Sequence, residues 1–367
     1  MTILQSRDRL LERFDRWADA PEFTAVDLGR FRIVYVLVAL SLMPTFTWVS
    51  TLPFSFFDAP SGPFQLVWAI PDAWFFVVLQ GALVVCLVCL GFGLLTRTMS
   101  VAVAVLFTIG FGYSYSFGKI DHSFLIILVP VMLAWAGWGG AVSVDSLRGS
   151  EGGAVRVRNY PVRLLAVLIG FAFLTSTVPK ILAGWLSFQS QATLGFIARG
   201  TATDGGWWLT DFLTGFQPHL LLESLDWATI VVEGGLVFAA LNWRAFRIWC
   251  ALLVGFHVGV ALTLGIFFII NLMSYGAFVK WSALRLPPLP LHLVVQLRRW
   301  GPLAAPLAGV VVWLLILAFG SARWLSGPGV VALAGAVAAW YLVRRLVVLV
   351  RGRRGRTAAL AGSSATR

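Results

Sequence analysis

The sequence predicts an all-α membrane protein, a polytopic bundle of about ten spanning helices with both termini in the cytoplasm. Composition is the first observation behind this prediction: of 367 residues, 59% are hydrophobic and 12% are charged, and the mean hydropathy is +0.86. These values lie outside the range of soluble globular domains. The second observation is a succession of long apolar runs, for which lipid permits helices but no open sheet. The third is an uneven placement of basic residues.

Ten apolar segments are long enough to cross a bilayer, because a spanning helix needs about 20 predominantly apolar residues. The seventh and eighth could instead form a re-entrant pair. The ten predicted spans are 29–49, 73–95, 98–117, 123–142, 161–183, 225–242, 245–264, 266–282, 303–321 and 327–350.

Arginine and lysine test this topology independently, since they gather on the cytoplasmic side of short loops. With both termini inside, 24 of the 28 basic residues fall on that side. The net charge of +12 is then explained by topology and by attraction to anionic membrane lipid, so no nucleic-acid partner is expected. The four exceptions are Lys119, Lys180, Arg199 and Arg323.

The chain divides into four predicted segments of an integral, multi-pass protein of the plasma (inner) membrane. Residues 1–25 form an interfacial amphipathic segment, because Leu10, Leu11, Phe14 and Trp17 recur at helical spacing. The transmembrane core, with eight spans, is 26–282. A linker and a C-terminal transmembrane pair occupy 283–350, and a basic cytoplasmic tail occupies 351–367.

Ionisable groups inside a membrane are costly unless they are paired or face a cavity, so they mark candidate functional sites. Lys180 lies near the outer end of the fifth predicted span. Glu233 and His257 lie about 12 and 10 Å below the same surface, at 1.5 Å per residue. Three further polar residues enter the outer half of the membrane: His122, Asn271 and Tyr275.

A purely structural interpretation stays open for these residues. Glu233 and His257 could form a hydrogen bond that only stabilises the bundle, and Lys119 and Lys180 could extend their ammonium groups to the membrane surface. Cys86 and Cys89 are one helical turn apart, but their depth in the second span argues against a redox pair, which needs an exposed thiolate. No metal site is expected.

Four motifs in order resemble the vitamin K-dependent γ-carboxylase superfamily, whose bacterial members are the HTTM (horizontally transferred transmembrane domain) proteins. The first is Gly118–Leu125, which contains Lys119, Asp121 and His122, and the second is Ser143–Asp145. The third is Val178–Trp185. The fourth combines Phe256 and His257 with Asn271–Tyr275. The resemblance covers residues 20–282.

The resemblance implies that Lys180 is a base that deprotonates a reduced vitamin K-type quinone such as menaquinol, and that His122 positions the reacting groups. A desolvated lysine can be neutral at physiological pH and can then accept a proton. His257 matches a histidine of the family in the same helix, and Glu233 resembles an acidic position of bacterial members. The remaining residues of the implied quinone pocket are Lys119, Asp121, Trp185, Asn271 and Tyr275.

Two classes of function remain open. The animal carboxylases carry a large luminal domain, whereas this chain ends soon after its tenth predicted span, so we expect a separate extracytoplasmic protein to supply the second substrate. The first class of function is a quinol-dependent membrane enzyme that acts on such a substrate. The alternative is a non-enzymatic membrane protein, either a transporter or a quinone-binding partner of a redox enzyme; no internal repeat of the kind seen in transporters is evident.

The topology predicts that reporter fusions at residue 60 and at the C-terminus lie on opposite sides of the membrane. A periplasmic phosphatase reporter is expected to be active at residue 60, and a cytoplasmic fluorescent reporter at the C-terminus, because basic residues flank the latter and are missing around the former. Signals from the same side at both positions would overturn the arrangement.

Overall fold

The structure is a computed structural model, which describes residues 3–149, 157–320 and 325–364. Its regular secondary structure is helical, and no strand occurs among these residues. The chain forms two compact units. Unit 1 comprises residues 1–169 and 270–325, and unit 2 comprises 170–269 and 326–367. The division follows packing and cuts across the sequence segments 26–282 and 283–350, which stay a prediction.

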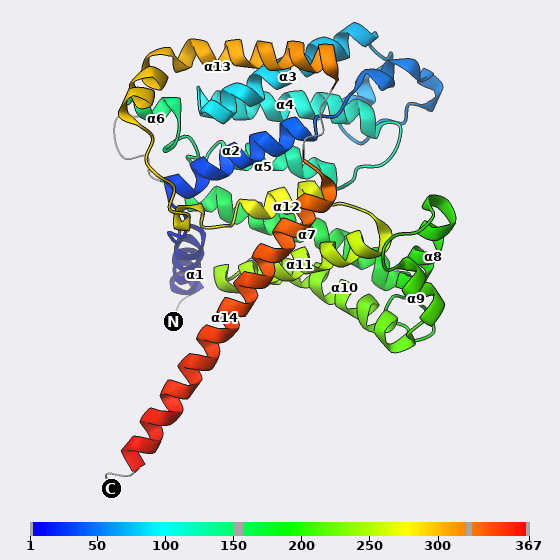
Figure 1. The fold of residues 1–367 in the computed structure, drawn as a ribbon, viewed down its shortest axis with the longest axis vertical. Helices are drawn as coiled ribbons and strands as arrows, with labels where there is room; N and C mark the ends of the chain where they lie inside the picture. Colours follow the sequence, from blue (N-terminus) through cyan, green and yellow to red (C-terminus); the bar gives the residue numbers. More distant parts are fainter. Residues whose placement is uncertain (1–2, 150–156, 321–324, 365–367) are drawn as a thin grey trace. The chain divides into compact units, whose positions relative to one another are not determined.

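Unit 1 is built around α3, which packs against α2, α4 and α13 (Figure 1). The helix α7 (Asn159–Leu182) begins in this unit and ends in unit 2, while all of α12 except its first residue belongs to unit 1. The other helices are α1 (Ile3–Ala18), α2 (Ala25–Ser41), α3 (Ala73–Phe92), α4 (Thr96–Tyr115), α5 (Leu125–Leu133), α6 (Val144–Arg148), α12 (Ile269–Gly276) and α13 (Leu291–Phe319). Five short 3₁₀ turns join them: Thr47–Thr51, Phe54–Phe56, Pro63–Leu66, His122–Phe124 and Trp281–Ala283.

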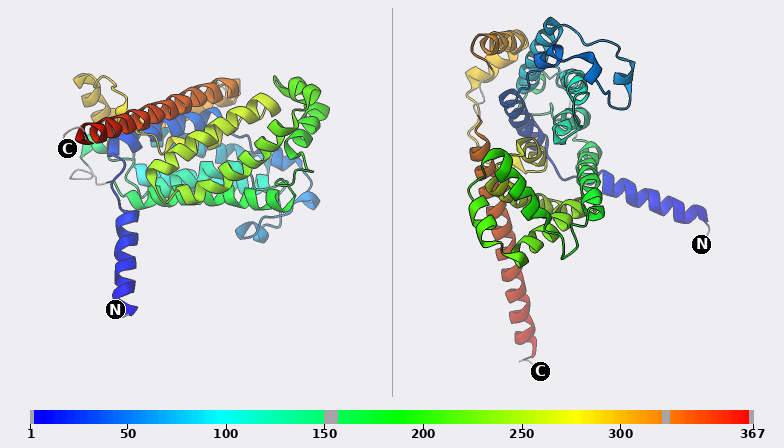
Figure 2. Two further views of the ribbon diagram at one scale, coloured as in Figure 1. Left: turned by 90° about the horizontal axis from the view of Figure 1, so that it is seen from below. Right: turned by 90° about the vertical axis from the view of Figure 1, so that its right-hand side faces the viewer.

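Unit 2 contains the second half of α7 and five further helices. The long helix α14 lies along α11, as the left view of Figure 2 shows. Two short helices, α8 and α9, fold against one another beside α10 and share a small apolar cluster of Ile197, Leu213 and Leu222. The bounds are α8 (Ala192–Asp204), α9 (Thr210–Phe216), α10 (His219–Ala239), α11 (Trp243–Leu264) and α14 (Gly327–Ser364).

Six helices are long and apolar enough to cross a membrane, so the predicted class of helical membrane protein is supported by length and composition. These are α3, α4, α7, α11, α13 and the Gly327–Arg351 part of α14. Only 11% of the most apolar stretch of α13 and 6% of that of α14 is buried inside the protein. An apolar helix with so little protein around it is suited to contact with lipid.

The other four predicted spans correspond to shorter or more polar helices. The helix α2 has 17 residues and α12 has eight. Eight residues form about 12 Å of helix, whereas the hydrocarbon core of a bilayer is about 30 Å thick. The helix α10 has 21 residues but carries three buried carboxylates, Glu223, Asp226 and Glu233. The count of ten spans stays a prediction.

The predicted fourth span, 123–142, is helical only from His122 to Leu133 and then continues as turns. Pro130 lies inside the short helix, and Gly137 adopts a positive φ of 84°. A glycine-rich apolar segment has a high hydropathy and so resembles a spanning helix. Each glycine nevertheless destabilises a helix by about 1 kcal/mol relative to alanine. The backbone carbonyls that leave the helix therefore need other donors.

Arg32 of α2 supplies those donors. Its side chain is fully buried, and its guanidinium donates to the carbonyl of Trp138 at 2.6 Å and to that of Val142 at 2.5 Å. The indole of Trp138 in turn donates to the Ser100 hydroxyl at 3.0 Å. A planar guanidinium can bond two acceptors at once, which explains why an arginine occupies this position.

Asp27 holds the beginning of α2 in place. Its carboxylate accepts from the backbone N–H of Thr24 at 2.8 Å in a capping box and from that of Ser282 at 2.7 Å. Burial by itself raises the pKa of Asp27, but the hydrogen bonds from Ser282 and Thr24 outweigh it and lower the pKa below its ordinary value. This stabilisation is present above the pKa of the unfolded carboxyl and is lost as the pH falls through the folded value.

We expect Arg32→Lys to lower the melting temperature in detergent measurably. The ammonium keeps the charge but cannot bond both carbonyls, and each buried group left unsatisfied costs about 1–3 kcal/mol. Arg13→Lys on the exposed face of α1 is the control and is expected to leave the melting temperature unchanged. Equal melting temperatures for Arg32→Lys and the wild type would show that the two hydrogen bonds contribute no net stability.

Candidate functional site

The predicted site residues belong to both units. Unit 2 holds Lys180, Trp185, Glu233 and His257. Unit 1 holds the other five, which are Lys119, Asp121, His122, Asn271 and Tyr275.

The end of α7 shapes the site in unit 2. The chain closes the helix with a Schellman motif: the N–H of Trp185 donates to the carbonyl of Lys180 at 3.2 Å, and that of Gly184 donates to the carbonyl of Ile181 at 3.0 Å. Gly184 has a φ of +83°, which disfavours residues with a side chain. The turn folds Trp185 back over the last helical residues, so its ring centroid lies 5.4 Å from Lys180 Nζ.

Lys180 forms an ion pair with Glu233 of α10. The Glu233 side chain is only 6% exposed and the Lys180 side chain is 22% exposed, so the carboxylate is inside the protein while the ammonium is at its edge. Ser176, one turn before Lys180 on α7, also hydrogen-bonds to Glu233. The sequence interpretation in which Lys180 only extends its charge to the membrane surface omits this partner.

Glycines let α7 and α10 approach closely enough for the pair to form. A Cβ atom on Gly170 would come within 2.6 Å of the Cα of Val237, and one on Gly234 would come within 3.1 Å of the Thr177 side chain. Both glycines therefore sit at contacts between these two helices. Close approach of small residues is a common way for membrane helices to pack, and here it brings the neighbouring Glu233 within reach of Lys180.

Aromatic rings surround the histidine of the candidate site. His257 of α11 is 1% exposed, and its ring centroid lies 4.9 Å from that of Phe268, 5.4 Å from that of Phe256 and 6.2 Å from that of Phe173. Its burial agrees with the expectation that His257 and Glu233 face the interior. The carboxylate of Glu233 is bonded to Lys180, and its closeness to His257 stays a prediction.

A second polar group lies between α4 and α5 in unit 1. The Asp121 carboxylate accepts from the N–H of Ser123 at 2.8 Å and from its hydroxyl at 2.5 Å, and the same hydroxyl lies 2.6 Å from the hydroxyl of Tyr115. Lys119 and Asp121 are exposed, and His122 is half-buried. Burial lowers the pKa of His122; the charge of Asp121 opposes this shift and that of Lys119 adds to it. His122 is thus disposed to be neutral, with one nitrogen able to accept a proton.

Asn271 and Tyr275 lie on α12, and both are 4% exposed. The side-chain oxygen of Asn271 is buried and has no hydrogen-bond partner in the described part of the chain. A buried amide oxygen without a donor is costly, so this atom could accept a hydrogen bond from a bound molecule. The sequence identified both residues by their depth.

Sequence reasoning missed two contributors to the site in unit 2. Ser176 has no distinguishing pattern, since a serine in an apolar helix usually bonds its own backbone. Gly184 did carry a signal, because glycine directly after a helix predicts a positive φ. Among the residues that the structure describes, no group of three or more His, Cys, Asp and Glu side chains could hold a metal ion, and the three cysteines are free.

No family model matches the chain, and no curated protein or solved structure has a detectable similarity to it.

The buried pair is expected to show strong energetic coupling in a double-mutant cycle. Removing one partner of a buried ion pair leaves an uncompensated charge and costs about 3–5 kcal/mol, whereas removing both costs much less. Lys180→Met and Glu233→Leu, singly and together, test this by chemical unfolding in detergent. The matched control is the more exposed pair of Lys280 and Glu22, 3.0 Å apart, for which a coupling of about 0–1 kcal/mol is expected. Equal coupling in both pairs would contradict the assignment of a special environment to Lys180.

Proposed function

We propose that this chain is a quinol-dependent membrane enzyme of the vitamin K-dependent γ-carboxylase type, in which Lys180 is the base that deprotonates a hydroquinone hydroxyl. The observation that carries the proposal is the Lys180–Glu233 ion pair at the end of α7, with Trp185 folded over the ammonium. A lysine held at the edge of the protein by a buried carboxylate can both meet a ligand and exchange a proton.

Glu233 explains how a paired lysine can become a base. When a quinol enters and displaces water, the two charges of the Lys180–Glu233 ion pair lose solvation, which raises the free energy of the ionised state. Moving one proton from the ammonium to the Glu233 carboxylate then leaves a neutral amine and a neutral acid. The amine then takes the proton of the quinol hydroxyl: an O–H bond breaks, an N–H bond forms, and the quinolate gains the electron pair. The quinolate is the species that reacts with dioxygen in the chemistry implied by the family resemblance.

Aromatic side chains beside Lys180 suit a flat ring. The ring of Trp185 lies 5.7 Å from that of Phe196 on α8, and Phe196 is 50% exposed. Partly exposed aromatic rings offer faces for offset stacking, worth about 0.5–1.5 kcal/mol beyond the area buried. A naphthoquinol such as menaquinol can stack there with a hydroxyl directed to Lys180.

The proposal also includes the membrane topology and the source of the second substrate. Ten spans, both termini in the cytoplasm and residence in the plasma membrane would place Lys180 at the outer leaflet, where a separate extracytoplasmic protein could supply the second substrate. His122, half-buried and disposed to be neutral, is proposed to position or stabilise reacting groups. Its contribution is separable, because His122→Gln removes the titratable ring without touching the ion pair.

A non-enzymatic function is the second candidate, and the same ion pair supports it. Transporters use paired charges within the membrane to couple proton movement to substrate, and a quinone-binding partner of a redox enzyme needs the ring site without the base. Purified protein that retains a quinone yet consumes no oxygen with the reduced quinone would favour this alternative.

We expect Lys180→Arg to fold and to bind quinone but to lose turnover by about 10²–10⁴-fold, the usual contribution of a general base. Arginine keeps the charge and can pair with Glu233, but it does not deprotonate. Glu233→Gln is expected to lose turnover as well, because the lysine loses its proton acceptor. The assays are oxygen consumption and quinone epoxide formation with a reduced naphthoquinone in detergent, and native mass spectrometry for bound quinone.

Lys280→Arg is the control for this experiment, since Lys280 also pairs with a glutamate but lies in unit 1. It is expected to keep full activity. A Lys180→Arg protein as active as the wild type would exclude the base mechanism while leaving the helical membrane fold unaffected.

A further inference from the structure

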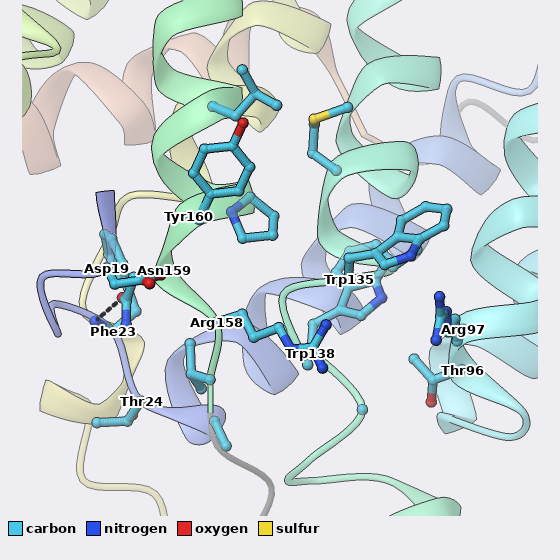
Figure 3. Close-up of a pocket in the computed structure, with 18 of the residues that line it drawn as sticks. Asp19, Phe23, Thr24, Thr96, Arg97, Trp135, Trp138, Arg158, Asn159 and Tyr160 are labelled. Carbon is cyan, nitrogen blue, oxygen red and sulfur yellow. Dashed lines mark hydrogen bonds between the residues drawn. The ribbon is translucent and has the colours of Figure 1, made fainter. Parts of the chain in front are cut away.

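Unit 1 contains a wide cavity that the proposed enzyme site does not use. Its volume is about 1320 Å³, and its walls come from four stretches of unit 1. These are the link between α1 and α2, the first turn of α4, the end of α5 with the turns after it, and the start of α7. Figure 3 shows the cavity with its lining side chains. Pockets for small molecules usually measure about 300–1,000 Å³, so this one has room for a larger ligand.

Two arginines face the cavity from different elements. Arg97 comes from the first turn of α4 and Arg158 from the residue before α7, and Figure 3 shows them reaching in from different sides. Both are exposed. In the described part of the chain, neither guanidinium has an acidic partner within ion-pair distance, and the one acidic lining residue, Asp19, pairs with neither. The cavity thus carries two uncompensated guanidinium groups and one carboxylate.

The rest of the wall is largely apolar and aromatic. The guanidinium of Arg97 lies 5.1 Å from the ring centroid of Trp135, which is 41% exposed. Tyr160, 45% exposed, stands on another side of the cavity, and Met132 and Leu164 add apolar surface. Half-exposed tryptophan and tyrosine are typical of the level of the lipid headgroups.

The places of the two arginines in the sequence also agree with a cavity at the level of the lipid headgroups. Arg97 and Arg158 lie at the beginnings of α4 and α7, two helices long and apolar enough to span, so both arginines belong to the membrane surface and not to its centre. The distribution of basic residues assigns this surface to the cytoplasm, whose leaflet carries anionic lipid.

We propose that this cavity binds one anionic phospholipid, with its phosphodiester between Arg97 and Arg158 and an acyl chain along the apolar wall beside Trp135. Guanidinium groups bind phosphate oxygens through paired, charge-assisted hydrogen bonds. A neutral quinone has no negative charge to pair with the two arginines, and inorganic phosphate has no apolar part to contact the wall. An anionic amphiphile uses both, and it is the ligand class that a basic pocket at a membrane surface selects. The proposal is independent of the chemistry at Lys180.

The test is native mass spectrometry of the full-length protein, titrated in detergent with phosphatidylglycerol, with phosphatidylcholine of the same acyl chains, and with inorganic phosphate. We expect retention of phosphatidylglycerol over phosphatidylcholine, and binding about tenfold or more weaker for the double variant Arg97→Gln/Arg158→Gln. The matched control is Arg298→Gln/Arg299→Gln, which removes two exposed arginines of α13, one of them also stacked on a tryptophan, Trp300. This control is expected to bind phosphatidylglycerol as the wild type does.

Three results would overturn the proposal. Unchanged binding by the cavity variant would show that the arginines are not the site. An equal loss in the control variant would show general attraction to a basic surface. Displacement of the lipid by inorganic phosphate at similar concentration would show a plain anion site. If the double variant does not fold, Arg158→Gln alone serves, because its guanidinium bonds no group in the described part of the chain, and the same three results apply to it.

Discussion

A membrane interior offers no water to a charged or polar group, so such groups are stabilised by partners within the chain or at the surface. This constraint explains three features that hydropathy alone leaves unconnected. The buried guanidinium of Arg32 donates to two carbonyls of the turns after α5. Asp27 joins the start of α2 to the segment around Ser282. Glu233 is buried because Lys180 and Ser176 meet it.

The same constraint governs how the helices end. The helices α3 and α7 both close with a Schellman motif around a glycine of positive φ, Gly93 and Gly184, which satisfies the last backbone carbonyls. At α3 the turn contacts the start of α6, because the N–H of Asp145 donates to the carbonyl of Gly93 at 3.0 Å. At α7 the turn brings Trp185 onto Lys180. A backbone requirement of the helix end thus creates the aromatic cover over the ammonium.

The two proposed ligand sites follow opposite electrostatic rules. At Lys180 the charges are nearly balanced by an ion pair, which suits a neutral quinol that exchanges a proton without bringing a charge. In the cavity of unit 1 the positive charges are left unbalanced, which suits an anionic headgroup that completes them. The two proposals therefore assign proton transfer to one site and a permanent counter-charge to the other, and the separate experiments can fail independently.

The sequence by itself determined the helical membrane class and the position of four of its long apolar helices. The predicted spans 73–95, 98–117, 161–183 and 245–264 agree within a few residues with α3, α4, α7 and α11, because continuous apolar runs of about 20 residues have few alternatives in lipid. It also singled out Lys180, Glu233 and His257 as ionisable residues within predicted spans. Only tertiary structure decided which of them pair. Helix depth does not encode rotation about the axis or the closeness of two helices, and the contacts at Gly170 and Gly234, which direct Glu233 to Lys180, depend on residues far apart in the chain. The early end of α5 was likewise decided by a distant residue, because Arg32 satisfies the carbonyls that glycine-rich turns leave open.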